Sequence, residues 1–261
     1  MLQLLNDRIY KLYNIVDRKE YEGMCNKYEC GMHGEHGIFK EPLGYGTKDH
    51  IVEAIVYQVC CLCGVECAFA RVRKTEESIG VFSRFEIPEG YNFMHASVLF
   101  GTWLLHVSDL LGKTAVMAKE FRKPTLLTIL YKYLIIDYLT GQLDRHMDNM
   151  AILEKNGKPT WYKLYDNGLA LGGNYSNTDI AIKRLNSGFF NTRVGSSTEI
   201  REELIKYKNS MKLGKIILPA ITYRSVSSII DACDIYNQLC KSRRESMVNF
   251  MLRQKKDIES W

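Results

Sequence analysis

Apolar residues recur at helical spacing over residues 49–63, which predicts a helix early in the chain. The apolar positions that share one face are Ile51, Ile55, Val59 and Leu62. Asp49 can cap the start of this helix, because a carboxylate accepts hydrogen bonds from unpaired N–H groups there. Gly64 can end it, because glycine readily adopts a left-handed conformation.

Shorter apolar runs on both sides of this helix predict strands. "GIFKEP" (37–42) precedes it, and "CAFARVRK" (67–74) and "SIGVFSRFEI" (78–87) follow it. Residues 8–16 are expected to form a strand or a short ordered arm, and residues 23–47 a glycine-rich hairpin region. The pattern therefore predicts a small α+β lobe.

Longer segments with helical periodicity follow from residue 95 onward. The expected helices cover 95–111 and 124–141, with later ones near 199–210, 222–240 and 243–258. One hairpin interrupts them at 150–166, with its turn at Asn156-Gly157, a dipeptide that favours tight hairpin turns. We place a hinge near 86–92 and divide the chain into 1–88 and 89–261.

Composition and charge narrow the class of protein. Of 261 residues, 46% are apolar and 25% are charged, as in ordinary globular proteins. The net charge of +5 comes without a basic run or stripe, so we predict no nucleic-acid partner. No stretch reaches the roughly 18 apolar residues of a membrane helix, and the start lacks a basic signal-peptide region. We expect a cytoplasmic protein, and secretion by a route without a signal peptide stays open.

Eight cysteines raise the question of disulfides or metal. Four of them lie in "CCLCGVEC" (60–67), where neighbours on one helix point in different directions, so free thiols are expected. Cys25, Cys30, His33 and His36 suggest zinc, but their spacing of four, two and two intervening residues is no common zinc-finger pattern. We therefore predict no zinc site.

Candidate chemistry concentrates in "DRHMDN" (144–149), which lies between two apolar runs. Asp144 and Asn149 are close enough in sequence for one loop to present both, and the hairpin returns Asp166 to the same region. A carboxylate and an amide oxygen suit a hard metal ion such as Mg²⁺. Asp-x-x-x-x-Asn followed by Asp-x-Gly, with Gly168 last, is the layout of a kinase catalytic centre.

The other polar residues of this stretch leave alternatives open. Arg145 can contact a phosphate or pair with a nearby acid, and His146 can touch substrate or bond loop carbonyls. Asp148 is expected to be a solvated loop charge.

A kinase also needs a lysine on a small-lobe strand and a glutamate on the next helix. Lys40 and Glu53 occupy those places. Glu53 lies among apolar residues, where an unpaired carboxylate is costly, so it requires a cationic partner. Gly34 and Gly37, before Lys40, would let backbone N–H groups approach a phosphate.

With these pieces in order, the chain resembles the HipA-like serine/threonine kinases, whose fold is distantly related to that of phosphatidylinositol 3- and 4-kinases. The matching motifs are "GIFKEP", "HIVEAIVYQVCCLCGV", "SIGVFSRFEIPEG", "LDRHMDNMAIL" and "YKLYDNGLALG". The resemblance implies an α+β, two-lobed protein-kinase-like fold, with a small β-rich N-lobe and a mostly helical C-lobe.

The same resemblance implies roles for individual residues, with ATP and Mg²⁺ as cofactors. Asp144 would orient or deprotonate the accepting hydroxyl, and Asn149 and Asp166 would bind Mg²⁺. Lys40 would contact an ATP phosphate and pair with Glu53. The positions implied along the adenine-binding hinge are Phe85, Glu86 and Ile87.

The implied activity is phosphorylation of Ser or Thr on an unidentified protein, with autophosphorylation in loops such as "GSSTEI" also open. "DNGLAL" also resembles the lipid kinases, so a phosphoinositide kinase acting on membrane lipid is an alternative. A nucleotide-binding pseudokinase module is another. An antitoxin-like regulator is kept among the partners, although the chain is too short for the extra N-terminal subdomain of longer HipA proteins.

Overall fold

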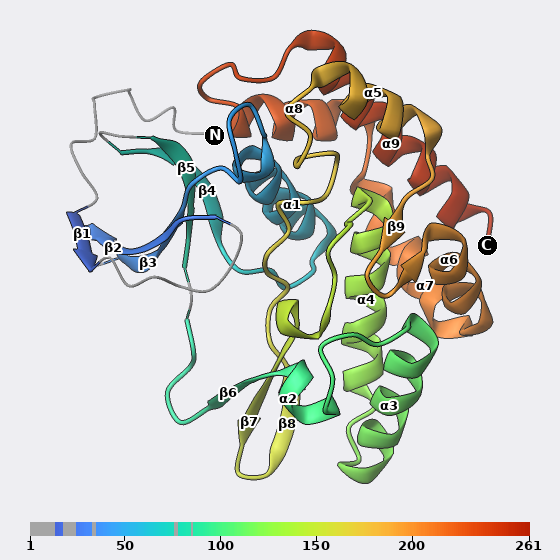
Figure 1. The fold of residues 1–261 in the computed structure, drawn as a ribbon. Coiled ribbons are helices and arrows are strands. Elements are labelled where there is room, and N and C mark those ends of the chain that lie inside the picture. Colours follow the sequence, from blue (N-terminus) through green and yellow to red (C-terminus); the bar gives the residue numbers. More distant parts are fainter. Residues whose placement is uncertain (1–13, 18–24, 33–34, 76–77, 85) are drawn as a thin grey trace.

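The N-terminal part of the molecule is an antiparallel sheet with the strand order β1-β2-β3-β5-β4 (Figure 1). The computed structural model describes residues 14–17, 25–32, 35–75, 78–84 and 86–261. The strands are β1 (Asn14–Asp17), β2 (Lys27–Met32), β3 (Glu35–Lys40), β4 (Ala70–Lys74) and β5 (Ile79–Ser83). Most of the strand expected over 8–16 therefore lies outside the described residues.

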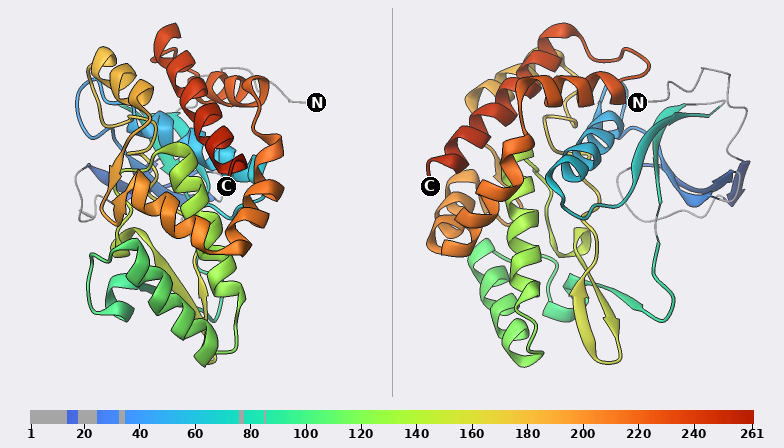
Figure 2. Two further views of the ribbon diagram at one scale, coloured as in Figure 1. Left: turned by 90° about the vertical axis from the view of Figure 1, so that its right-hand side faces the viewer. Right: turned by 180° about the vertical axis from the view of Figure 1, so that it is seen from behind.

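Helix α1 (Asp49–Cys63) joins β3 to β4 and lies between the sheet and the helical lobe (Figure 2). It ends, as predicted, at Gly64 in the left-handed conformation, with φ 63°. The predicted cap at Asp49 was wrong, because Lys48 is the N-cap residue. The Asp49 carboxylate instead accepts a hydrogen bond of 2.7 Å from the Thr47 hydroxyl, which fixes the loop before the helix.

The C-terminal part is mostly helical and surrounds α4 (Thr125–Thr140). The other helices are α2 (Ala96–Phe100), α3 (Val107–Glu120), α5 (Thr178–Ser187), α6 (Ser197–Lys206), α7 (Lys208–Ile217), α8 (Tyr223–Cys233) and α9 (Lys241–Glu259). Helix α4 contacts α3, α6, α7 and α9, because its sequence is apolar on nearly all sides and must be buried. The predicted α+β fold is confirmed.

A second antiparallel sheet has the order β6-β7-β8 and lies at the base of the helical lobe in Figure 1. Its strands are β6 (Asn92–His95), β7 (Ala151–Lys155) and β8 (Lys158–Trp161). The β7–β8 turn is the predicted one, with φ of 53° at Asn156 and 71° at Gly157, which are the two positive values of a type I′ turn. A short ribbon of β9 (Asn191–Thr192) and β10 (Gly195–Ser196) follows α5.

The single helix expected over 95–111 was wrong. His95 pairs with β7 as the last residue of β6, and α2 ends at Gly101, whose φ of 70° breaks the helix. Helix α3 begins only at Val107. Sequence periodicity missed the strand because its partner lies more than fifty positions away.

Two later helices also differ from expectation. The helix near 199–210 is divided at Tyr207 into α6 and α7. The helix expected over 222–240 stops at Cys233, because the Asp234 carboxylate accepts the backbone N–H groups of Gln238 and Leu239 at 2.7 and 2.9 Å. The helix predicted over 243–258 is confirmed as α9.

The apolar core runs without a break from α1 into the helical lobe. Ile55 of α1 belongs to the same buried cluster as Leu130 of α4. The N-terminal sheet has a separate aromatic cluster, in which Phe39 and Phe82 are buried together. Helix α1 therefore packs against both the N-terminal sheet and the helical lobe, and the lobe division at residue 88 stays a prediction.

The cysteines whose side chains the structure describes are all free thiols, as predicted. The zinc alternative cannot be checked in full, because the side chains of Cys30, His33 and His36 lie outside the described part. Within the described part, no group of three His, Cys, Asp or Glu side chains is placed so that it could hold a metal ion.

No single helix in the described ranges is long and apolar enough to cross a membrane. The segments Lys212–Ala220 and Tyr223–Cys233 pass that test as a pair bent by 64°, on length and composition only.

Candidate active site

The structure brings Lys40, Glu53 and Asp166 together from three elements. Lys40 is the last residue of β3, Glu53 lies in the second turn of α1, and Asp166 follows the β7–β8 hairpin. The Lys40 Nζ is 2.9 Å from Glu53 Oε1 and 3.2 Å from Asp166 Oδ1. Glu53 thus has the cationic partner that its apolar surroundings require.

The charges of this cluster support one another. Burial alone would lower the pKa of Lys40, but the carboxylates of Asp166 and Glu53 outweigh burial and raise it above its ordinary value. The Lys40 charge in turn lowers the pKa of Asp166. Burial raises the pKa of Glu53 against the attraction of Lys40. A protonated Lys40 and an ionised Asp166 are therefore the stable pair at neutral pH.

Asp144 lies in a loop of residues 141–149, here called the Asp144 loop. Its carboxylate Oδ1 accepts a hydrogen bond of 3.0 Å from Arg193 Nε, and its Oδ2 is 3.7 Å from His146 Nε2. Burial opposes ionisation of Asp144, but the hydrogen bonds from His146 and Arg193 and the charge of Arg193 outweigh it, so the pKa of Asp144 lies below its ordinary value. The Asn149 amide nitrogen donates to the Asp144 carbonyl at 2.8 Å, which closes the loop.

Gln142 joins the Asp144 loop to residues 166–176, here called the Asp166 loop. Its amide nitrogen donates to the Asp166 carbonyl at 3.0 Å, and its amide oxygen accepts the Asp144 N–H at 3.2 Å. Gln142 is almost fully buried. Sequence reasoning missed this residue, and its only signal is a polar side chain directly after a buried apolar helix.

Arg145 is fully buried and ties the same two loops together. Its guanidinium forms a doubly hydrogen-bonded ion pair with Asp137 of α4, at 2.8 and 2.9 Å. One of its nitrogens also donates to the carbonyl of Asn149 at 2.9 Å, and another donates to the side-chain oxygen of Asn167, in the Asp166 loop, at 2.7 Å. Of the two roles left open for Arg145, pairing with an acid is the observed one. Asp137, the missed partner, is the single acid inside the α4 sequence.

His146 and Asp148 form local contacts at the edge of the site. The ring Nδ1 of His146 accepts the backbone N–H of Asp148 at 3.2 Å, and the ring packs edge-on against Trp103. Asp148 has a half-exposed carboxylate, as expected, which accepts a hydrogen bond from Ser97. The described contacts give His146 a structural role in the loop, and contact with substrate stays open.

The oxygens of Asn149 and Asp166 suit a Mg²⁺ ion. Because the Asn149 nitrogen is used inside the loop, its amide oxygen is left without a hydrogen bond from any described residue. Asp166 adds an ionised carboxylate, of which one oxygen pairs with Lys40. An amide oxygen and a carboxylate are ligands that hard cations prefer, so the donor set fits the metal that the sequence implies.

The remaining predicted nucleotide-binding residues are less defined. Gly34 and Phe85 lie outside the described residues. Gly37 lies in β3, where a side chain would meet the ring of Phe82 at 2.7 Å, so packing alone requires glycine there. Glu86 and Ile87 are exposed in the connection from β5 to β6.

The Asp166 loop is also held from the last helix of the described chain. Arg243 of α9 is only 1% exposed, and one of its nitrogens donates to the carbonyls of Gly172 and Tyr175 at 2.8 and 3.0 Å. Its other two nitrogens lack a hydrogen-bond partner among the described residues. Sequence reasoning assigned α9 no part in the site.

The chain has a protein-kinase-like fold. No protein-family model matches the chain, and no curated protein matches its sequence. Among solved structures, the Helicobacter pylori proinflammatory kinase CtkA matches with a TM-score of 0.76 and 16% identity, over 96% of this chain and 95% of that chain.

Two further structures are more distant. A chain of the Shewanella oneidensis MR-1 toxin–antitoxin complex of HipA, HipB and operator DNA matches with a TM-score of 0.54 and 12% identity, over 95% of this chain and 66% of that chain. The Golgi casein kinase with Mn/ADP bound matches with a TM-score of 0.44 and 12% identity, over 92% and 71%, a likeness too distant to argue from. The likeness to the first two structures shows the fold alone.

Proposed function

We propose that the protein is an ATP- and Mg²⁺-dependent kinase of the HipA-like type that phosphorylates a Ser or Thr hydroxyl of a protein. The observation that carries the proposal is the contact of Lys40 with both Glu53 and Asp166, across 126 positions in the second case. Kinases hold the phosphate-binding lysine on a helix glutamate beside the metal-binding aspartate. Structural packing alone gives no reason to gather these three charges.

Each residue then has a separate task. Lys40 would pair with an ATP phosphate, and Asn149 and Asp166 would hold Mg²⁺, which supplies positive charge to the transferring phosphoryl group. Asp144, ionised by its surroundings, would orient the accepting hydroxyl. Gln142 and Arg145 would keep the two loops in register, so that positioning contributes much of the rate.

The proposal also covers the nucleotide, the acceptor and a regulator. Adenine would bind along Phe85, Glu86 and Ile87, with phosphates near Gly34 and Gly37. The acceptor is an unidentified protein or the enzyme itself. An antitoxin-like regulator stays a hypothesis, which the Shewanella oneidensis complex suggests by analogy alone.

A second candidate function is a lipid kinase with the same machinery. Exposed apolar side chains gather on α2 and in the loop after it, at Val98, Leu99, Trp103 and Leu104. This surface adjoins the Asp144 loop, because the Trp103 carbonyl accepts the Met147 N–H at 2.9 Å. An apolar surface beside the reaction centre suits a membrane as well as a protein acceptor.

Transfer of labelled phosphate from ATP with Mg²⁺ tests both candidates. The intact protein is compared with Lys40→Met, with the exposed-lysine control Lys74→Met, and with protein acceptors and phosphoinositide vesicles in parallel. The proposal expects label on protein and at least about a hundredfold loss in Lys40→Met alone. Label on lipid favours the second candidate. ATP binding without any transfer rejects both and favours a binding module.

A further inference from the structure

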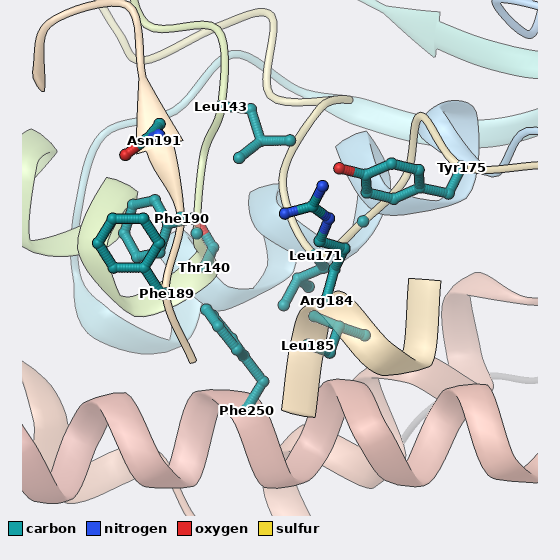
Figure 3. Close-up of a pocket in the computed structure, with 12 residues that line it drawn as sticks. Thr140, Leu143, Leu171, Tyr175, Arg184, Leu185, Phe189, Phe190, Asn191 and Phe250 are labelled. Atoms are coloured by element: carbon teal, nitrogen blue, oxygen red, sulfur yellow. The ribbon is translucent and has the colours of Figure 1, made fainter. Parts of the chain in front are cut away.

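A pocket of about 200 Å³ opens beside the Asp144 loop, between the end of α4, the Asp166 loop, α5, β9 and α9 (Figure 3). Its wall is mainly apolar and includes Leu171, Leu185, Phe190 and Phe250. Figure 3 shows the Arg184 guanidinium and the Tyr175 ring on one side of the opening, across from the rings of the α5–β9 connection. The pocket thus combines an apolar interior with a polar rim.

The pocket adjoins the position where an acceptor hydroxyl would react. Leu143 in its lining directly precedes Asp144. Asn191, also in the lining, lies two residues before Arg193, whose guanidinium bonds the Asp144 carboxylate. An acceptor polypeptide with its hydroxyl at Asp144 would therefore pass over the opening.

The rim carries positive charge without a fixed partner. The Arg184 side chain is exposed and forms no hydrogen bond or ion pair with any other residue in the described ranges. Arg193, outside the lining, is already paired with the Asp144 carboxylate, so Arg184 is, among the described residues, the rim cation that is free to bind an acceptor. A cation next to an apolar pocket is complementary to an apolar side chain that has an acidic neighbour.

We propose that this pocket holds a large apolar side chain of the acceptor polypeptide, and that Arg184 pairs with an acidic residue beside it. The volume is appropriate, because an apolar cavity of about 150 Å³ holds a benzene molecule. The inference rests on the proposed protein-kinase function and adds its substrate class: a hydroxyl flanked by an apolar and an acidic residue.

The test uses peptides with one serine, flanked at each neighbouring position by leucine and glutamate, by alanine and glutamate, or by leucine and lysine. The full chain is compared with Arg184→Glu, which reverses the rim charge, and with Asn191→Trp, which narrows the opening. Lys183→Glu is the matched control, since Lys183 is an exposed lysine next to Arg184 and does not line the pocket. Thermal unfolding verifies that each variant is folded.

We expect the full chain and Lys183→Glu to phosphorylate the leucine–glutamate peptide about tenfold more efficiently than the alanine peptide. Arg184→Glu should prefer lysine to glutamate, and Asn191→Trp should lose the preference for leucine. Equal preferences in all four proteins would overturn the proposal, as would phosphorylation of phosphoinositide vesicles but no peptide.

Binding of the same peptides, followed by fluorescence anisotropy, separates this inference from the kinase proposal. If nothing is phosphorylated but the leucine–glutamate peptide still binds best and loses affinity in Arg184→Glu, the pocket assignment stands and the kinase assignment fails. Binding without discrimination among the peptides overturns the pocket assignment.

Discussion

The Arg193 guanidinium lies against the Asp144 carboxylate, with Arg193 Nε 3.0 Å from Asp144 Oδ1. Arg193 comes from the turn between β9 and β10 and is half-exposed, whereas Asp144 is mostly buried. A hydroxyl that approaches the same oxygen has to share it with Arg193 or replace it. The contact therefore influences both the ionisation of Asp144 and access to it.

Replacing Arg193 by Gln should shift the acidic limb of the activity–pH profile to higher pH. Arg193 helps to keep the Asp144 pKa low, so its loss raises that pKa toward the ordinary value, and protonation of Asp144 begins at a higher pH on acidification. The pH dependence of kcat/KM measures this shift. Arg224→Gln, an exposed arginine on α8, should leave the profile unchanged. An unshifted limb in Arg193→Gln would contradict the role of Asp144.

Asp166 has a left-handed backbone conformation, with φ 56°. Two substitutions can therefore test the role of its charge and the cost of this conformation separately. Asp166→Asn should keep the fold, because asparagine tolerates this region, but should lose Mg²⁺-dependent transfer by at least about a hundredfold. Asp166→Ala removes the same charge and adds backbone strain, so it should be less stable than Asp166→Asn by about 1 kcal/mol. Mg²⁺ titration and denaturant unfolding measure the two effects. Equal activity of Asp166→Asn and the unaltered protein would refute the metal assignment.

Gln142→Leu should lower kcat by about a hundredfold and leave the KM for ATP nearly unchanged, because a small displacement of reacting groups is costly. The substitution leaves the Asp144 N–H and the Asp166 carbonyl without their partner. Gln254→Leu on α9 is a matched control, since Gln254 is also buried and, among the described residues, bonds only the Tyr138 carbonyl, away from the site. If both variants lose stability alike and neither loses kcat, Gln142 is purely structural.

Arg145→Met should cost about 3–5 kcal/mol of unfolding free energy, because it leaves the Asp137 carboxylate buried without a cation. Arg201→Met breaks the half-exposed pair with Asp257 and should cost less than about 1 kcal/mol. The double variant Arg145→Met with Asp137→Leu should regain part of the loss. Urea unfolding gives all three values. A double variant less stable than Arg145→Met would disprove the explanation by buried charge.

The sequence pattern predicted those helix ends and turns that depend on neighbouring residues alone. Helix α1 ends where Gly64 allows it, and the β7–β8 turn forms where Asn156 and Gly157 favour it. Strand β6 could not be predicted in the same way, because His95 extends only through pairing with Ala151 of β7. Short apolar segments take the structure that a distant partner imposes.

The site shows the same division. Lys40, Glu53 and Asp166 were predicted as a group because their chemistry is specific and a buried glutamate requires a cation. Gln142 and Arg193 were missed, because a glutamine after a buried helix is only a weak signal, and an arginine in the turn of a short ribbon has no sequence signature. Their roles come from the packing of segments that lie far apart in the chain.

The hydrogen bonds from Arg243 to the Asp166 loop have a consequence during protein synthesis. The ribosome makes the Asp144 and Asp166 loops before it makes α9. The carbonyls of Gly172 and Tyr175 therefore lack the Arg243 guanidinium as a donor until that helix has emerged. A nascent chain that already contains both loops would still lack this last support. Under the proposed function, a chain that lacks α9 should therefore transfer phosphate less well than the full chain.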